Sequence, residues 1–173
     1  MEEIPDNFAN DVYYFQGSYV DENNPFYASI DDKFLLTKDM TRLIKAGTYE
    51  IRLKAPENVS KIEIPEGVTV IGKNAVRYSI TKLISLPTTL KEIEDSAFYN
   101  CKELMTVNIP ASVETIGNSA FENCTDLESV VIGTEGGESA LASLGENAFA
   151  GCQDLSNVVI YSVEPPTAPE SAF

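Results

Sequence analysis

The sequence predicts a mainly β solenoid, in which short parallel strands stack in successive coils. One apolar pattern recurs in register along residues 59–173, with a period in the low twenties. That period is too short for a repeating pair of helices and fits one strand with a compact return. The apolar residues that end each copy alternate with other residues, as in a strand with one buried face. Because a coil cannot bury its apolar side alone, neighbouring coils have to supply the core.

The repeated unit reads Ala-Phe-x-x-Cys-x-x-Leu-x-x-Val-x-Ile. Complete copies begin at Ala97, Ala120 and Ala148. A weaker copy begins at Ala75, with Ser79 in place of the cysteine. A second apolar set lies between the units, and it includes Val68, Ile71, Leu90, Ile93, Val113 and Ile116. We expect these residues to form one continuous column, stabilised by roughly 1.5–3 kcal/mol for each large side chain that is buried.

Proline and glycine mark the places where the coils turn. Prolines follow three of the predicted strands, at Pro65, Pro87 and Pro110. Proline cannot donate to a β-ladder, so it belongs at a strand end. Gly72 and Gly117 permit turns that other residues resist. Phe149 follows Phe121 by 28 residues, against 23 for the preceding interval, and we expect the extra residues to form a glycine-rich loop over 133–139.

The same spacing is typical of a right-handed leucine-rich-repeat solenoid with few and short helical turns near the Ala-Phe sites. Residues 104–124 match nearly every position of Leu-x-x-Ile-x-Ile-Pro-x-x-Val-x-x-Ile-Gly-x-x-Ala-Phe-x-x-Cys. The chain therefore resembles the BspA-like (Treponema pallidum-type) leucine-rich repeats of bacterial surface proteins. This resemblance implies extracellular or cell-envelope placement and a role in adhesion or in contact with host proteins or glycans. It supplies no catalytic residues.

The N-terminal part reads differently from the repeats. We expect residues 1–58 to form an irregular β cap or variant repeat, and residues 59–173 to form about four to five coils of one continuous domain. The predicted cap strands are Phe26–Ile30, Phe34–Thr37, Arg42–Lys45 and Tyr49–Leu53, and Pro5–Phe8 resembles the stub of a preceding copy. The aromatic residues Tyr13, Tyr14, Phe15, Tyr19, Phe26 and Tyr27 either pack this cap or stack on a glycan. We expect the chain to be part of a longer repeat protein.

Composition removes several classes of function. A formal net charge of −15 disfavours nucleic acid and anionic membranes as partners. The absence of histidine removes the most common general base and most zinc sites. No apolar run is long enough to span a membrane. The first residues do not form a signal peptide, so the chain is either cytosolic or a portion that lacks its leader.

Cysteines and acidic clusters are the remaining candidates for chemistry. Three cysteines, Cys101, Cys124 and Cys152, occupy equivalent repeat positions. Stacked coils would hold their Cβ vectors parallel about 4.8 Å apart, which does not suit a disulfide, so we expect buried, reduced thiols and no metal site. Two acidic clusters, one of Glu92, Glu94 and Asp95 and one of Glu135 and Glu138, are interpreted as solvated surface. We therefore expect no catalytic residues, no cofactor and no enzyme activity.

The candidate binding residues are strand positions that point away from the core. On stacked parallel strands they form rows on one open, concave face. These candidates are Glu63, Ser85, Thr106, Asn108, Ser129, Val131, Asn157, Val159 and Tyr161. We expect a non-enzymatic, secreted or cell-surface adhesion module that contacts a protein or a glycan through this face. The alternative is a structural spacer within a larger surface protein, in which the same residues only solvate a sheet.

Overall fold

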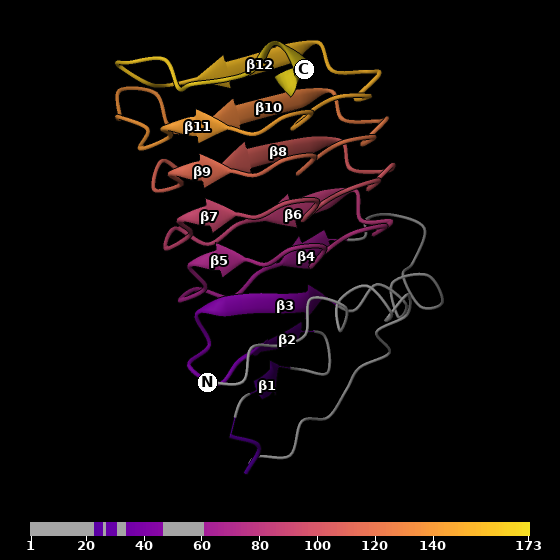
Figure 1. Cartoon of the computed structure of the whole chain (residues 1–173), viewed down its shortest axis with the longest axis vertical. Helices are drawn as coiled ribbons and strands as arrows, with labels where there is room; N and C mark the ends of the chain where they lie inside the picture. The colour runs from indigo at the N-terminus through magenta and orange to yellow at the C-terminus, as the bar shows by residue number, and fades with distance from the viewer. Residues whose placement is uncertain (1–22, 26, 31–33, 47–60) are drawn as a thin grey trace.

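A computed structural model describes residues 23–25, 27–30, 34–46 and 61–173. In these residues the chain forms two β-sheets, of seven and five strands, and one short 3₁₀-helix. Figure 1 shows the coils stacked one above the other, from the N-terminal strands at the bottom to β12 at the top. The prediction of a mainly β, leucine-rich-repeat type of fold with parallel strands is confirmed.

The five-stranded sheet carries the strand of the repeated pattern. Its strands are β4 (Lys61–Glu63), β6 (Leu83–Ser85), β8 (Thr106–Ile109), β10 (Ser129–Ile132) and β12 (Asn157–Ile160). All of them pair in parallel, in chain order. In β8 the exposed Thr106 and Asn108 alternate with the buried Val107 and Ile109, so one face of the sheet points into the core.

The seven-stranded sheet begins with an antiparallel unit and continues as parallel two-residue strands. The antiparallel unit consists of β1 (Tyr27–Ile30), β2 (Phe34–Thr37) and β3 (Arg42–Ala46). The parallel strands are β5 (Val70–Ile71), β7 (Glu92–Ile93), β9 (Thr115–Ile116) and β11 (Ser143–Leu144). The sequence identified the apolar residues of these short strands but did not predict a second sheet.

The core lies between the two sheets, and phenylalanine rings run through it as a stack. The rings of Phe98 and Phe121 have centroids 4.8 Å apart and planes 7° apart. The next pairs, Phe121–Phe149 and Phe149–Phe173, are 5.2 and 5.4 Å apart and are also nearly parallel. Offset or edge-on ring pairs add about 0.5–1.5 kcal/mol beyond buried area. The expected column of matching apolar residues is therefore present as one buried cluster.

Each coil also turns twice through the left-handed region of backbone conformation. One such residue directly precedes the Ala-Phe pair and another lies two positions after the phenylalanine, as with Ser119 (φ 55°) and Asn123 (φ 62°). Asn and Gly tolerate this region better than most residues, which explains their recurrence at the second position. Tyr78 (φ 63°) is the bulky exception.

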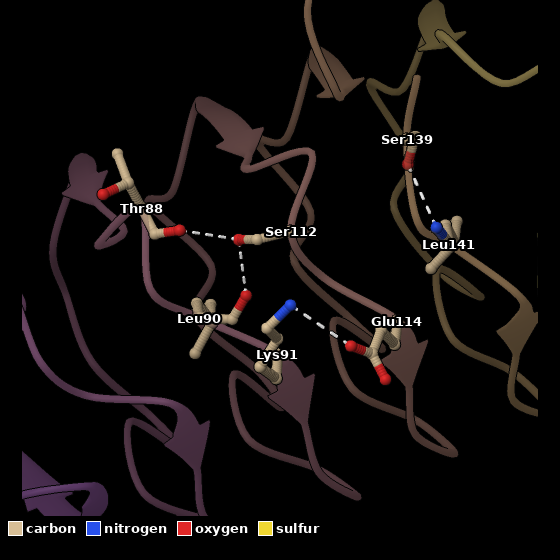
Figure 2. Close-up of polar contacts among 7 residues, drawn as sticks. All are labelled: Thr88, Leu90, Lys91, Ser112, Glu114, Ser139 and Leu141. Carbon is tan, nitrogen blue, oxygen red and sulfur yellow. Dashed lines mark hydrogen bonds and ion pairs between the residues drawn. The ribbon is translucent and has the colours of Figure 1, made fainter. Parts of the chain in front are cut away.

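Polar side chains tie neighbouring coils together along the edge of the stack. Ser112 Oγ lies 2.8 Å from the carbonyl oxygen of Thr88 and 2.6 Å from that of Leu90 (Figure 2). On the same side Lys91 and Glu114 form an ion pair with an N–O distance of 3.2 Å. Both side chains are exposed, so this pair contributes at most about 1 kcal/mol.

The Ala-Phe sites at Ala97, Ala120 and Ala148 are hydrogen-bonded turns, whereas the last site, Ala172-Phe173, carries the one helical turn in the described residues, Glu170–Ala172. The expectation of few and short helical turns is therefore confirmed. Of the predicted cap strands, Phe34–Thr37 is confirmed, Arg42–Lys45 is confirmed and continues to Ala46, and the first is present over Tyr27–Ile30, with Phe26 outside the described residues. The predicted strand Tyr49–Leu53, the stub Pro5–Phe8 and all of the aromatic cap residues except Tyr27 lie outside the described residues. No helix among the described residues is long and apolar enough to cross a membrane.

Candidate binding surface

The outer face of the five-stranded sheet brings the candidate residues into two rows. The first row contains Lys61, Leu83, Thr106, Ser129 and Asn157, which are paired in register across the five strands. The second row lies two residues further along each strand and contains Glu63, Ser85, Asn108, Val131 and Val159. All eight strand residues that the sequence predicted are therefore brought together on one face. Sequence reasoning missed Leu83, which occupies the same row as Thr106.

The two ends of this face differ in charge. At β4, Lys61 Nζ donates to Glu63 Oε1 over 2.5 Å, and this contact lowers the pKa of the Glu63 carboxyl. From β8 to β12, the six outward residues carry no charge at all. Asn157 Nδ2 donates to Ser129 Oγ over 2.9 Å, so some of these polar groups already bond to each other. The result is an uncharged, hydrogen-bonding strip on a protein whose net charge is −15.

An apolar corner lies where β10 and β12 end. Val131 and Val159 are paired in register and half-buried, and Tyr161 follows β12 directly. A side chain at Gly133 would place its Cβ 3.3 Å from the Cβ of Tyr161, so glycine leaves room beside the tyrosine. Tyr161, the ninth predicted residue, thus lies next to the strip rather than in its two rows.

The expected glycine-rich loop borders this corner. The backbone N–H of Ser139 donates to the carbonyl oxygen of Tyr161 over 2.8 Å, and Gly137 N–H closes a turn onto Thr134. Ser139 Oγ also accepts a hydrogen bond from the backbone of Leu141 (Figure 2). Both ends of the insertion are therefore anchored, and its exposed middle stands beside the ends of the strands.

The short strands of the other sheet form a polar groove of about 440 Å³ that the sequence did not predict. Its floor includes Gly117 and Gly145, where an added Cβ would lie 2.6 Å from the Asp95 nitrogen and 2.5 Å from the Asn118 nitrogen, respectively. Only a residue without a Cβ allows the coils to approach this closely. The glycines therefore act here in packing between coils.

The first acidic cluster contributes to the structure and is not simply solvated, as the sequence had suggested. Glu94 forms an ion pair with Arg42 and accepts a hydrogen bond from the backbone of Lys73. Asp95 Oδ1 accepts a hydrogen bond from the backbone of Asn118 over 2.8 Å. Both residues are half-buried, whereas Glu92, Glu135 and Glu138 are exposed as expected. The carboxylates of Glu94 and Asp95 therefore bind neighbouring coils.

The three cysteines are free thiols in equivalent places. Each Sγ donates to a carbonyl oxygen of the preceding coil over 3.2 Å, and the acceptors are Val76, Phe98 and Phe121. The adjoining Cys101 thiol and burial raise the pKa of Cys124, and the Cys124 thiol and burial raise that of Cys152. A raised pKa suppresses the reactive thiolate. Within the described ranges, no group of three or more Cys, Asp or Glu side chains is placed to hold a metal ion.

Solved structures of several bacterial proteins share this fold. The pneumococcal vaccine antigen PcpA matches with a TM-score of 0.66 and 24% identity, over 91% of this chain and 42% of its own. A leucine-rich repeat protein from Eubacterium ventriosum matches with a TM-score of 0.60 and 22% identity, over 81% of this chain and 41% of its own. A leucine rich cell surface protein from Faecalibacterium prausnitzii matches with a TM-score of 0.53 and 21% identity, over 82% and 43%. The chain thus spans less than half the length of each, and at these identities the likeness concerns the fold alone.

The family comparison is more specific. No curated protein sequence matches the chain significantly. The BspA type leucine rich repeat region matches residues 53–173 in six copies, which is more than half of the chain. The phenylalanines, cysteines and strands that recur in register in the structure lie within the matched residues. The chain therefore belongs to the BspA-type leucine-rich repeat family.

Proposed function

We propose that this chain is a non-enzymatic binding module of a secreted or cell-surface bacterial protein, and that it contacts a protein or a glycan through the outer face of β8, β10 and β12. The observation that carries the proposal is the uncharged strip formed by Thr106, Asn108, Ser129, Val131, Asn157 and Val159. Placement outside the cell is supported by the family and by a neighbour that is described as a cell surface protein.

Charge and rigidity make this strip suitable for binding. Burying a charged side chain costs far more than burying a neutral one, so an uncharged patch can be covered by a partner at low desolvation cost. The strip lies on regular strands, and the stacked coils beneath them fix its shape. Val131 and Val159 offer apolar contact, while Thr106, Asn108, Ser129 and Asn157 offer donors and acceptors.

Glycan and protein arrays test the proposal. The chain is compared with a double variant, Asn108→Lys and Val131→Lys, which places two charged side chains on the strip. The matched control is Thr115→Lys with Ser143→Lys, which adds the same charge to the outward positions of β9 and β11. We expect at least one array signal that the strip variant loses and the control keeps.

The other two functional classes give different results. A structural spacer gives no array signal with any of the three proteins. A binder that uses another surface gives a signal that both variants keep. An enzyme would show turnover in a hydrolase screen that the change of one carboxylate abolishes.

A further inference from the structure

The neutral strip is bordered on one side by a ladder of carboxylates. Glu103, Asp126 and Asp154 occupy the same repeat position, two residues after each cysteine, and lie just before strands β8, β10 and β12. Backbone hydrogen bonds stack this part of the coils, since Asp126 N–H donates to Lys102 O and Asp154 N–H donates to Thr125 O. All three side chains are exposed. The backbone positions of the ladder are therefore about one strand spacing apart, near 4.8 Å, and each carries an acidic side chain.

The opposite border of the strip is acidic as well. Glu135 and Glu138 belong to the anchored insertion after β10, and Glu164 follows β12. These three side chains are also exposed. Among the described residues, none of the six border carboxylates forms an ion pair with a lysine or an arginine. Glu94 of the groove differs in this respect, because it pairs with Arg42.

Electrostatic reasoning gives the chemistry of the partner that fits this arrangement. Like charges in register repel each other, and a cation placed beside them relieves the repulsion. Charge complementarity at the rim of an interface speeds association and excludes partners of the wrong charge. A negatively charged glycan or an acidic protein surface would meet repulsion on both borders. A neutral glycan would gain nothing from them.

On the basis of the function proposed above, we infer that the strip is a docking surface for a polypeptide segment with an uncharged, partly apolar centre and lysine or arginine residues on both sides. The centre covers the strip and its apolar corner at Val131 and Val159. The basic residues reach the ladder at Glu103, Asp126 and Asp154 and the second border at Glu135, Glu138 and Glu164. The partner is thus a protein rather than a glycan.

Selection from a phage-displayed library of random dodecapeptides on the immobilised chain tests this inference. Peptides are retained when they lose binding to the Asn108→Lys, Val131→Lys variant and keep it with the Thr115→Lys, Ser143→Lys control. Their affinities are then measured for a ladder variant, Glu103→Gln, Asp126→Asn and Asp154→Asn. The matched control neutralises three other exposed acids that form no ion pair within the described part of the chain, by Glu92→Gln, Glu146→Gln and Glu170→Gln, and changes the net charge equally.

The inference predicts that the retained peptides carry lysine or arginine on both sides of an uncharged centre. Their affinity falls about tenfold in the ladder variant and less than about twofold in the matched control, because exposed ion pairs act over short distances. Retained peptides that are neutral or acidic would overturn the inference, as would equal losses in the two triple variants. A neutral glycan that binds the strip on the array would leave the proposed function intact and refute only this partner. If no peptide and no array probe depends on the strip, the proposed function fails too.

Discussion

Replacing Phe121 by alanine tests whether the stack of rings holds the coils together. The Phe121 ring lies between Phe98 and Phe149, with centroid distances of 4.8 and 5.2 Å, and it is completely buried. Removal of a buried phenylalanine side chain costs about 3–5 kcal/mol in unfolding free energy. We expect the upper end of this range, because two stacked contacts are lost together, each worth about 0.5–1.5 kcal/mol.

Phe173 provides the internal comparison. It stacks on Phe149 at 5.4 Å but remains 57% exposed, so Phe173→Ala removes one ring contact and much less buried area. We expect a loss of about 1–2 kcal/mol, from partial burial and one stacked pair. Urea unfolding followed by circular dichroism measures both variants, and Phe121→Leu separates the loss of volume from the loss of the ring. If Phe121→Ala destabilises the protein no more than Phe173→Ala does, the coils do not depend on a shared core of rings.

Two further predictions concern the backbone and the thiols. Gly117→Ala should lower the unfolding free energy by about 3 kcal/mol, the upper end of the cost of overpacking, because the new Cβ would lie 2.6 Å from the Asp95 backbone nitrogen. Gly136→Ala should cost only about 1 kcal/mol for its positive φ, because its Cβ meets nothing within 4 Å. Equal losses in thermal unfolding would contradict the steric explanation. The raised pKa of Cys124 keeps this thiol neutral in the folded protein, whereas the same thiol ionises in the unfolded chain above a pH of about 8.5. The contribution of Cys124 to the free energy of unfolding is therefore complete below that pH. Above it, this contribution declines by up to about 1.4 kcal/mol per pH unit. The difference in unfolding free energy between the wild-type protein and Cys124→Ala should therefore shrink between pH 7 and pH 10, and a constant difference would refute the burial of a neutral thiol.

The repeat made much of the fold predictable, because it shows which residues occupy equivalent positions in successive coils. The recurrence of Ala-Phe and Cys placed Phe98, Phe121 and Phe149 at one position in successive coils, and stacking followed from the need to bury them. Alternation in the strand assigned Thr106 and Asn108 to the outer face in the same way. Both predictions follow from the repeated sequence pattern and from the requirement that apolar side chains be buried.

Other features of the structure depend on contacts between different coils, and the repeated sequence pattern does not reveal which residues make these contacts. The parallel part of the second sheet was missed because β5, β7, β9 and β11 have only two residues each, too few for alternation to be visible. Leu83 was missed because an apolar residue at an outward position looks like part of the core. The structural use of Glu94 and Asp95 depends on partners 21 to 52 residues away, so their charge alone suggested a solvated surface.

The segment 133–139 shows that one coil can be longer than its neighbours while the strands keep their order in both sheets. It adds residues between β10 and β11, yet β10 keeps its partners on both sides and β11 still pairs with β9. The junction between the sheets thus accommodates added chain while the strands on either side keep their partners. On this principle, we expect foreign sequences grafted between Thr134 and Glu138 to leave the pairing of β10 and β11 with their neighbours unchanged.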